Sequence, residues 1–370
     1  MSLLTMGVEE EFLLVDRASG APADRGSVVV SSAGEVLGDQ VHSEFFNAQI
    51  EVNSQPTADC GALRAELARL RRTVAEAAAD ADCRIIASGT PVRPPDEPLA
   101  VSGYDERYAR MARRYPTLVD AQDGLACGCH VHIGTLDRAQ AVGLTGHIRP
   151  WLPALQALSG NSPFSSGHDT GLASWRSVRF GRWPTAGPAP LLALEAEYEA
   201  YAQALVDREV LLDRKMIYWY ARPSEHVPTL EVRVADVNAD LDTVVLLAAL
   251  VRGLAAALLP SVAEGAPPPP VPHRQLVDAH ALAAANGLRG TGLHPATGEE
   301  ISTERLVMLL LAQAAPGLEA TGDLPLAEQQ LRRLCAEGDG ASRQRAVHER
   351  HGRLRGVVDA LASATCGDDG

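Results

Sequence analysis

The sequence predicts an α+β protein in which one largely antiparallel sheet carries helices on one face. Two observations support this class. Strand-like segments are mixed with helix-like segments as far as about residue 262, and the segments after residue 273 are helical. That order favours an antiparallel sheet over repeated strand–helix–strand units. We expect one catalytic domain over residues 1–370, with a sheet-bearing core at 1–262 and a helical C-terminal part at 273–370.

Periodicity assigns each segment in turn. Apolar residues that alternate along the chain predict strands, and apolar residues that recur every three or four positions predict helices. The predicted strands are 5–15, 49–53, 85–88, 129–134, 217–221 and 229–234. The predicted helices are 60–82, 105–114, 137–158 with a break at Pro150, 194–211, 240–259, 274–285, 303–314, 324–336 and 342–362. A Gly/Ala/Ser-rich stretch follows the first strand, 161–190 is expected to be a long loop, and 265–272 a linker.

Composition excludes several function classes. The formal charge of −14 argues against a nucleic-acid partner, because phosphate binding needs clustered Lys and Arg. The most apolar stretch, 241–259, contains Asp242 and Arg252, so a buried helix is expected there and no membrane span. No targeting segment precedes the first strand, which predicts a cytoplasmic protein. Lys215 is the only lysine, and it does not lie in a Walker A phosphate loop.

Four predicted strands share one pattern of polar residues. Side chains at positions i and i+2 of a strand point to the same face. The polar positions are Glu9 and Glu11, then Gln49, Glu51 and Asn53, then His130 and His132, and finally Glu231 and Arg233. Apolar residues occupy the alternate positions around them. We therefore expect a sheet with an apolar face against helices and a polar concave face.

The polar face has the chemistry of a cation site. Glutamate is a poor strand former and like charges in register repel, so these strands need something positive between them. Carboxylate oxygens with an imidazole suit Mg²⁺ or Mn²⁺. Arg233 among the carboxylates suits a phosphate oxygen bridged to such metals. An ordinary half-exposed sheet explains any one of these strands, but Lys, Thr and Ser are absent from the outward positions of all four.

The run from Cys127 to His132 raises the alternative of a zinc site, because Cys and His are the usual zinc ligands. Cys129 and His130 are adjacent, so in a strand they face opposite ways, and no second Cys/His pair of suitable spacing is present. We expect Cys129 to be a small core residue. The six cysteines are too few for a disulfide scaffold in a chain of this length, which favours reduced thiols.

Longer motifs extend this pattern and resemble a known family. They run in family order from residue 7 to about 255. The chain resembles the YbdK-type carboxylate–amine ligases, also called type 2 glutamate–cysteine ligases, in these segments: Gly7-Val8-Glu9-Glu10-Glu11-Phe12, His130-Val131-His132-Ile133-Gly134, Asn161-Ser162-Pro163-Phe164, Asp169-Thr170-Gly171, Ser174-Trp175-Arg176, Arg222-Pro223-Ser224 and Thr229-Leu230-Glu231-Val232-Arg233-Val234.

The resemblance implies a glutamine-synthetase-like fold, in which a curved antiparallel sheet encloses metal ions and the phosphates of ATP. Residue by residue, it implies a set of metal ligands: Glu9, Glu11, Glu44, Glu51, His130 and Glu231. His130, His132 and Arg233 are expected near the nucleotide, and Arg176, Arg222 and Arg233 are expected to act in catalysis. Seven residues separate Glu44 from Glu51, so a bulge or loop between them is required to bring both to one face.

The function that these residues predict is an ATP- and Mg²⁺-dependent carboxylate–amine ligase, with Mn²⁺ as a substitute metal. A small-molecule carboxylate would be activated as an acyl phosphate and then captured by an amine. We expect the long loop that contains Arg176 to close over the site and exclude water. No nucleic-acid or membrane partner is expected, and a homodimer is left open.

Three positions depart from the family pattern, namely Pro91, Tyr220 and Ala285. They are expected to touch nucleotide or substrate, which leaves the carboxylate and the amine unidentified. Two alternatives to the ligase remain at this point. One is a metal-dependent hydrolase that works without ATP. The other is a catalytically silent homologue that binds nucleotide.

Overall fold

The computed structural model describes residues 3–103, 106–120 and 125–367. Within these residues the main sheet has seven strands in the order β2-β3-β1-β5-β9-β8, with β4 paired to the second half of β1, and all pairs are antiparallel. Its strands are β1 (Met6–Asp16), β2 (Val41–Ser43), β3 (Gln49–Asn53), β4 (Cys83–Ile86), β5 (Gly128–Ile133), β8 (Ala221–Pro223) and β9 (Leu230–Asp236). Two short hairpins are β6 (Phe164–Ser165) with β7 (His168–Asp169), and β10 (Thr291–Leu293) with β11 (Glu300–Ser302).

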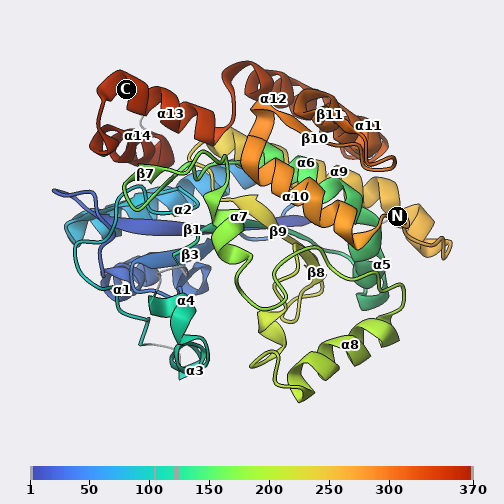
Figure 1. The fold of residues 1–370 in the computed structure, drawn as a ribbon, viewed down its shortest axis with the longest axis horizontal. Coiled ribbons are helices and arrows are strands. Elements are labelled where there is room, and N and C mark those ends of the chain that lie inside the picture. The colour runs from blue at the N-terminus through green and yellow to red at the C-terminus, as the bar shows by residue number, and fades with distance from the viewer. Residues whose placement is uncertain (1–2, 104–105, 121–124, 368–370) are drawn as a thin grey trace.

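Helices are divided between the two sides of the sheet. Figure 1 shows α2, α9 and the C-terminal helices on one side, and α3, α4, α7 and α8 on the other. The helices are α1 (Gly26–Leu37), α2 (Cys60–Asp80), α3 (Glu106–Arg114), α4 (Pro116–Asp120), α5 (Arg138–Ile148), α6 (Leu152–Ser159), α7 (Trp175–Phe180), α8 (Glu195–Asp207), α9 (Leu241–Ala263), α10 (His273–Asn286), α11 (Thr303–Thr321), α12 (Leu324–Glu337), α13 (Gly340–His351) and α14 (Leu354–Cys366).

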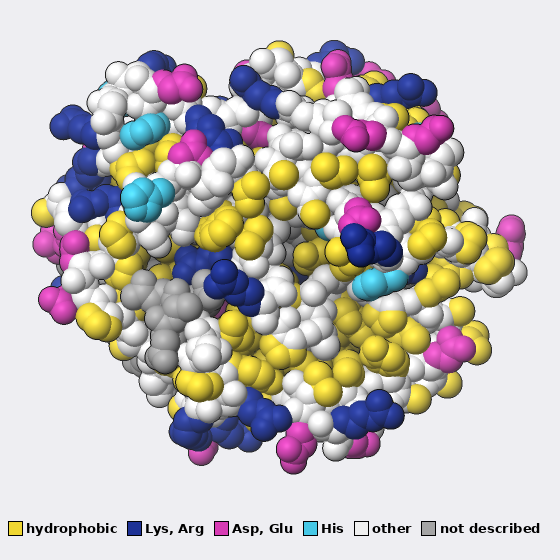
Figure 2. All heavy atoms as spheres, in the orientation of Figure 1, with side chains coloured by type: hydrophobic (Ala, Val, Ile, Leu, Met, Phe, Trp, Pro, Cys, Tyr) yellow, Lys and Arg dark blue, Asp and Glu magenta, His cyan; other side chains and the backbone are white. Residues whose placement is uncertain are grey.

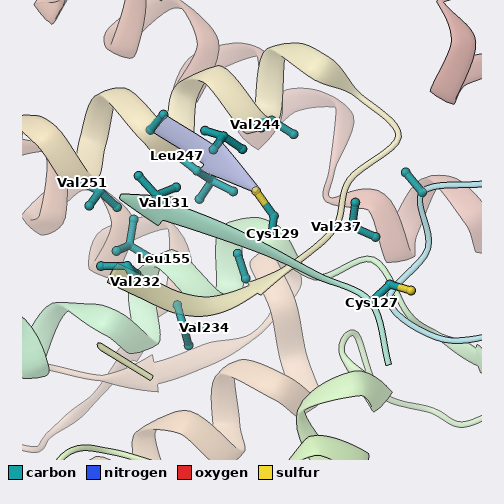
Figure 3. Packing of buried hydrophobic residues seen from close by; sticks show 14 of the residues in the cluster. Cys127, Cys129, Val131, Leu155, Val232, Val234, Val237, Val244, Leu247 and Val251 are labelled. Carbon is teal, nitrogen blue, oxygen red and sulfur yellow. The ribbon is translucent and has the colours of Figure 1, made fainter. Parts of the chain in front are cut away.

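The apolar face of the sheet packs on α9. Cys129 and Val131 of β5 lie against Val244, Leu247 and Val251 of this helix, as Figure 3 shows. Cys129 is fully buried, so its prediction as a core residue is confirmed. In the described residues α9 is the one helix with the length and hydropathy of a membrane span, but 78% of its most apolar window is buried inside the protein. It is a core helix, as the sequence predicts.

Most predicted segments are present, with five corrections. The Gly/Ala/Ser-rich stretch after β1 contains α1, which buries Val29, Ala33 and Leu37 at helical spacing. The strand predicted at 217–221 is wrong in its position, because only Ala221 of that range joins the sheet, as the first residue of β8.

The other three corrections concern elements within longer predicted segments. The helix predicted over 342–362 is two helices, α13 and α14, because Gly352 adopts φ 65° and ends the first. The long loop at 161–190 contains α7, and the C-terminal part carries the β10–β11 hairpin among its helices.

Candidate active site

The polar face of the sheet forms the floor of a cavity of about 560 Å³. Every site residue predicted from the sequence lines it: Glu9, Glu11, Glu44, Glu51, His130, His132, Arg176, Arg222, Glu231 and Arg233. In Figure 2, Lys and Arg side chains gather near the centre of the displayed face, beside the segment labelled α7 in Figure 1. The predicted set is therefore one site in space, although its members span more than two hundred residues of chain.

Strand register brings these side chains together. Glu9 of β1 lies opposite His130 of β5, and Glu11 lies opposite Glu51 of β3. Glu231 of β9 lies between His132 on one neighbouring strand and Arg222 on the other. Directly opposite residues in an antiparallel pair have their side chains within about 5.5 Å at Cβ, so each pairing is a contact between functional groups.

Glu11, Glu44 and Glu51 form one acidic cluster, and one carboxylate oxygen from each lies within 4.8 Å of the others. Glu44 belongs to the turn between β2 and β3, so the loop that its spacing requires is present. Enclosure in the cavity and the neighbouring charge of Glu11 raise the pKa of Glu44 to about 7. Enclosure, Glu9 and Glu44 raise the pKa of Glu51 well above its usual range. Repulsion among three carboxylates this close favours the binding of a cation between them.

A second cluster combines Glu9, His132 and Glu231, whose ligand atoms also lie within 4.8 Å of one another. Oε2 of Glu9 lies 3.0 Å from Nδ1 of His130, and Oε1 lies 3.0 Å from Nε2 of His132. Burial opposes ionisation of Glu9, but the bonds to the two imidazoles outweigh it and hold its pKa well below the usual range. This cluster is charged before any ligand arrives.

Two arginines fix the position of Glu231. Nε of Arg222 donates to Oε2 of Glu231 at 2.8 Å, while its NH1 group donates to the backbone carbonyls of Lys215 and Ile217. Arg233 donates to the other oxygen of the same carboxylate. Burial opposes ionisation of Glu231, but these positive charges keep its pKa well below its ordinary value.

Arg233 lies at an irregularity in the sheet. The register between β5 and β9 shifts between Cys129 and Val131, so that two residues of β9 face His130. Bulges of this kind redirect a side chain and are frequent next to active sites. Nδ1 of His130 lies 3.5 Å from NH1 of Arg233, and burial together with that charge lowers the histidine pKa.

Arg176 lies on the short helix α7, within the segment that was predicted to be a loop. Ser174 caps this short helix by accepting from the Ser177 backbone N–H. The guanidinium of Arg176, only 3% of the residue being exposed, donates to the carbonyl of Arg233 at 3.2 Å and stacks on Phe180. A side chain on Gly128 would collide with it, since an added Cβ lies 2.3 Å from its NH2 group. The segment predicted to be a loop is therefore helical around Arg176, and closure of that segment over the site stays a prediction.

Several lining residues were not found from the sequence. Tyr108 of α3, Trp183 and Tyr218 form an aromatic wall, and Phe45 packs edge-on against Tyr108 and Trp183 with ring centroids 5.6 and 5.7 Å apart. Lys215, the only lysine, also lines the cavity. Their sequence neighbourhoods carry no strand-like polar alternation. For Lys215, the one sequence feature that could have drawn attention to it is that it is the only lysine of the chain.

The three departures from the family pattern do not line the cavity, so the cavity gives no support to the expectation that they touch nucleotide or substrate, which stays a prediction. Tyr220 instead packs on the His280 ring at 4.5 Å between centroids, and its backbone carbonyl accepts from the Arg233 N–H. Pro91 is buried, and the Ala285 carbonyl accepts from the backbone of Ala173. For these three residues the structure shows burial, ring packing and backbone hydrogen bonds.

The donor set fits Mg²⁺. Both clusters are rich in carboxylate oxygen, the ligand that hard divalent cations prefer. Nε2 of His130 is buried without a hydrogen-bond partner among the described residues, which leaves a nitrogen facing the acidic cavity. Neither cluster contains a cysteine. The zinc alternative raised by Cys127 and Cys129 therefore has no support in the described part of the chain.

Comparison with known proteins identifies the family. The model of glutamate–cysteine ligase family 2 matches residues 5–362. A protein of Salinispora arenicola, provisionally named glutamate–cysteine ligase 2, is 41% identical over 372 residues, which cover 99% of this chain and 96% of that protein. A relative from Nocardia farcinica, provisionally named glutamate–cysteine ligase 2-1, is 40% identical over 366 residues, covering 99% and 94%. The chain belongs to glutamate–cysteine ligase family 2.

Two solved structures share the fold. A glutamate–cysteine ligase from Francisella tularensis in complex with AMP aligns with TM-score 0.72 at 14% identity, over 98% of this chain and 88% of that one. A bifunctional glutathione synthetase from Pasteurella multocida aligns with TM-score 0.70 at 15% identity, over 99% and 52%. The predicted α+β, glutamine-synthetase-like fold is thereby confirmed.

Family membership also settles the reaction class. The chain is an ATP-dependent carboxylate–amine ligase, an enzyme that forms a C–N bond, as the motifs predict. The two alternatives, a metal-dependent hydrolase and a silent nucleotide-binding homologue, are not favoured.

Proposed function

We propose that the 560 Å³ cavity binds Mg–ATP over the two acidic clusters and activates an amino-acid-like carboxylate as an acyl phosphate. The observation that carries this proposal is the convergence of both clusters with Arg233 and Arg176 in one cavity. Glutamate and cysteine are the first substrate pair to test, because family relatives carry that name. The expected location is the cytoplasm, and a homodimer stays a prediction.

The residues that would hold Mg²⁺ are the members of the two clusters: Glu11, Glu44, Glu51, Glu9, His132 and Glu231. His130 adds an imidazole between the clusters, bonded to Glu9 and 3.7 Å from Glu11. When bound, the cations neutralise the phosphate oxygens and lower the barrier to phosphoryl transfer. The residues of the cavity supply the fixed positions that this transfer needs.

Arginines complete the charge balance. In the first step an oxygen of the substrate carboxylate attacks the γ-phosphorus, the bond to the β–γ bridging oxygen breaks, and ADP leaves. We assign Arg233 to the oxygens of the transferred phosphoryl group, because it lies on the floor of the cavity between Glu231 and His130. Arg222 has its Nε and both terminal groups bonded to Glu231 and to carbonyls. Its role is therefore to position Glu231.

The second step joins the amine. Its nitrogen attacks the acyl carbon, the carbon–oxygen bond to phosphate breaks, and the nitrogen loses a proton. Lys215 and the aromatic wall formed by Tyr108, Trp183 and Tyr218 line the same cavity, as does Phe45. A cation beside aromatic rings suits the α-carboxylate and side chain of an amino acid. Both substrates would thus lie between the wall and the sheet.

The test is a screen for ADP release over carboxylate and amine pairs with Mg–ATP. We expect ADP release that requires both substrates and falls to background in Glu9→Gln and Glu231→Gln. Arg305→Ala, on an exposed arginine outside the cavity, is the control and is expected to retain activity. Amide product equal to the ADP formed supports the ligase. Substrate turnover without ADP, or nucleotide binding without ADP release from any pair, contradicts it.

A further inference from the structure

A second and larger cavity, of about 890 Å³, lies on the opposite side of the sheet, among α2, α12, α13, α14 and the start of α9. It shares no lining residue with the active-site cavity among the described residues. Figure 1 shows α13 and α14 stacked beyond α2 at this corner of the fold. The proposed ligase mechanism uses none of its residues.

The lining is basic in an acidic protein. Six arginines and four carboxylates line the cavity, an excess of two positive charges in a chain whose formal charge is −14. Among the described residues, Arg72 of α2 and Arg350 of α13 are exposed arginines with no ion-pair or hydrogen-bond partner. Arginines of the three helices α2, α12 and α13 therefore line one cavity. Two of them, Arg72 and Arg350, are available to bind an anion.

Buried amides give the cavity a second, independent mark of a ligand site. Asn238 and Gln344 both line it and are 1% and 3% exposed. The side-chain nitrogen of Asn238 and the side-chain oxygen of Gln344 have no hydrogen-bond partner among the residues that the structure describes. A buried donor or acceptor without a partner destabilises the fold, so such groups are rarely left unpaired. Here one donor and one acceptor are both left open.

We propose that this cavity is a regulatory site for a small organic anion that carries a carboxylate or phosphate together with an amide-like donor and acceptor. The oxyanion would pair with Arg72 and Arg350, and the amide-like edge would reach Asn238 and Gln344. Leu241, Val347, Val357 and Leu361 in the lining would contact an apolar body. This is the chemistry of an acylated amino acid or of a pyrimidine nucleotide.

Arg71 connects the cavity with the active site. It lines the second cavity and is 2% exposed, and its guanidinium donates to both oxygens of Glu10 at 2.5 and 3.0 Å. It also donates to the carbonyl of Asn238 at 2.7 Å. Glu10 stands between Glu9 and Glu11 on β1. A ligand bound to Asn238 is therefore connected, through Arg71 and Glu10, to the strand that carries two proposed metal ligands.

Binding is tested without catalysis, so its outcome is independent of the proposed ligase mechanism. N-acetylglutamate and UMP, each titrated calorimetrically without metal, represent the carboxylate and phosphate sources. We expect saturable binding of one of them, weakened at least about tenfold in Arg72→Ala/Arg350→Ala. Ala360→Trp, which fills the cavity, is expected to abolish it. Arg208→Ala/Arg305→Ala, on exposed arginines outside both cavities, and Glu9→Gln are expected to bind normally.

Two outcomes overturn the proposal. The first is no saturable binding of either probe, and the second is binding that survives both cavity variants or is lost in Glu9→Gln. For the regulatory role, saturating probe is expected to change the apparent affinity for Mg–ATP at least about threefold. An unchanged affinity contradicts that role.

Discussion

Neighbouring glutamates on the two faces of β1 have opposite surroundings. Glu10 faces the helices, where it is fully buried and bonded by both oxygens to Arg71. Glu11, on the other face, shares the cavity with Glu44 and Glu51. Glu10 has a bidentate arginine partner built into the fold, whereas no described arginine or lysine forms an ion pair with Glu11, Glu44 or Glu51.

The difference separates a structural charge from a functional one. A buried pair contributes little net stability over an apolar pair, but it is costly to break because one ion is then left unpaired. A cluster of like charges raises its own pKa values and destabilises the folded chain until a cation binds. Conservative substitutions on the two faces are therefore expected to change different properties.

The largest effect is expected from Glu51→Gln. Loss of one carboxylate from the proposed cation cluster is expected to lower kcat/KM for amine-dependent ADP release by about 10³-fold or more, since a bound metal contributes several kcal/mol to the transition state. Stability is expected to stay constant or rise, because a repulsive charge is removed. Steady-state assays and chemical denaturation measure both. Full activity in this variant would remove Glu51 from the cation site.

Glu10→Gln is expected to show the reverse pattern. It leaves Arg71 buried without its counterion, which costs about 3–5 kcal/mol of unfolding free energy. Glu66→Gln, which breaks the more exposed pair with Arg69, is the matched control and is expected to cost less than about 1 kcal/mol. Urea denaturation compares the two variants. Equal losses would mean that burial does not distinguish these pairs.

The pH dependence sharpens the contrast. The pKa of Glu44 is raised from 4.5 to about 7, so the folded apoprotein retains a proton that the unfolded chain releases. Stability of the apoprotein therefore falls as pH rises from about 4.5 to 7. Cation binding relieves the repulsion, so the rise in Tm produced by Mg²⁺ is expected to be larger at pH 8 than at pH 5.5. An Mg²⁺ effect that shrinks with rising pH would contradict this assignment.

The smallest effect concerns the back face of β5. Cys129 lies opposite Glu10 in the sheet and is fully buried. Cys129→Ala is expected to cost about 1–2 kcal/mol for the small cavity left behind, with no change in metal content or activity. Elemental analysis and denaturation test this directly. Loss of bound zinc in the variant would revive the zinc alternative.

Periodicity alone located most of the floor of the site. Alternation places Glu9, Glu11, His130 and Glu231 on one face of their strands. The pairing of adjacent antiparallel strands then brings these polar faces side by side. Glu44 was different. It lies on a turn, where no period applies, and only the family resemblance pointed to it.

Contacts between distant segments could not be predicted in the same way. The aromatic wall comes from α3 and from irregular segments whose placement depends on tertiary packing. Arg71 did leave a signal, since it falls in the apolar stripe of α2 one position after Leu70, just as Glu10 falls on the apolar face of β1. A charged residue at a core position of each of two elements is a sign of a buried ion pair.

The most direct test of the cation-filled cavity is Mn²⁺ binding, followed by electron paramagnetic resonance in the presence of a non-hydrolysable ATP analogue. We expect at least two Mn²⁺ ions per chain in the wild type, the loss of at least one in Glu51→Gln, and no loss in Glu10→Gln. Binding of no Mn²⁺ beyond that carried by the nucleotide, or an equal loss in both variants, would contradict the account.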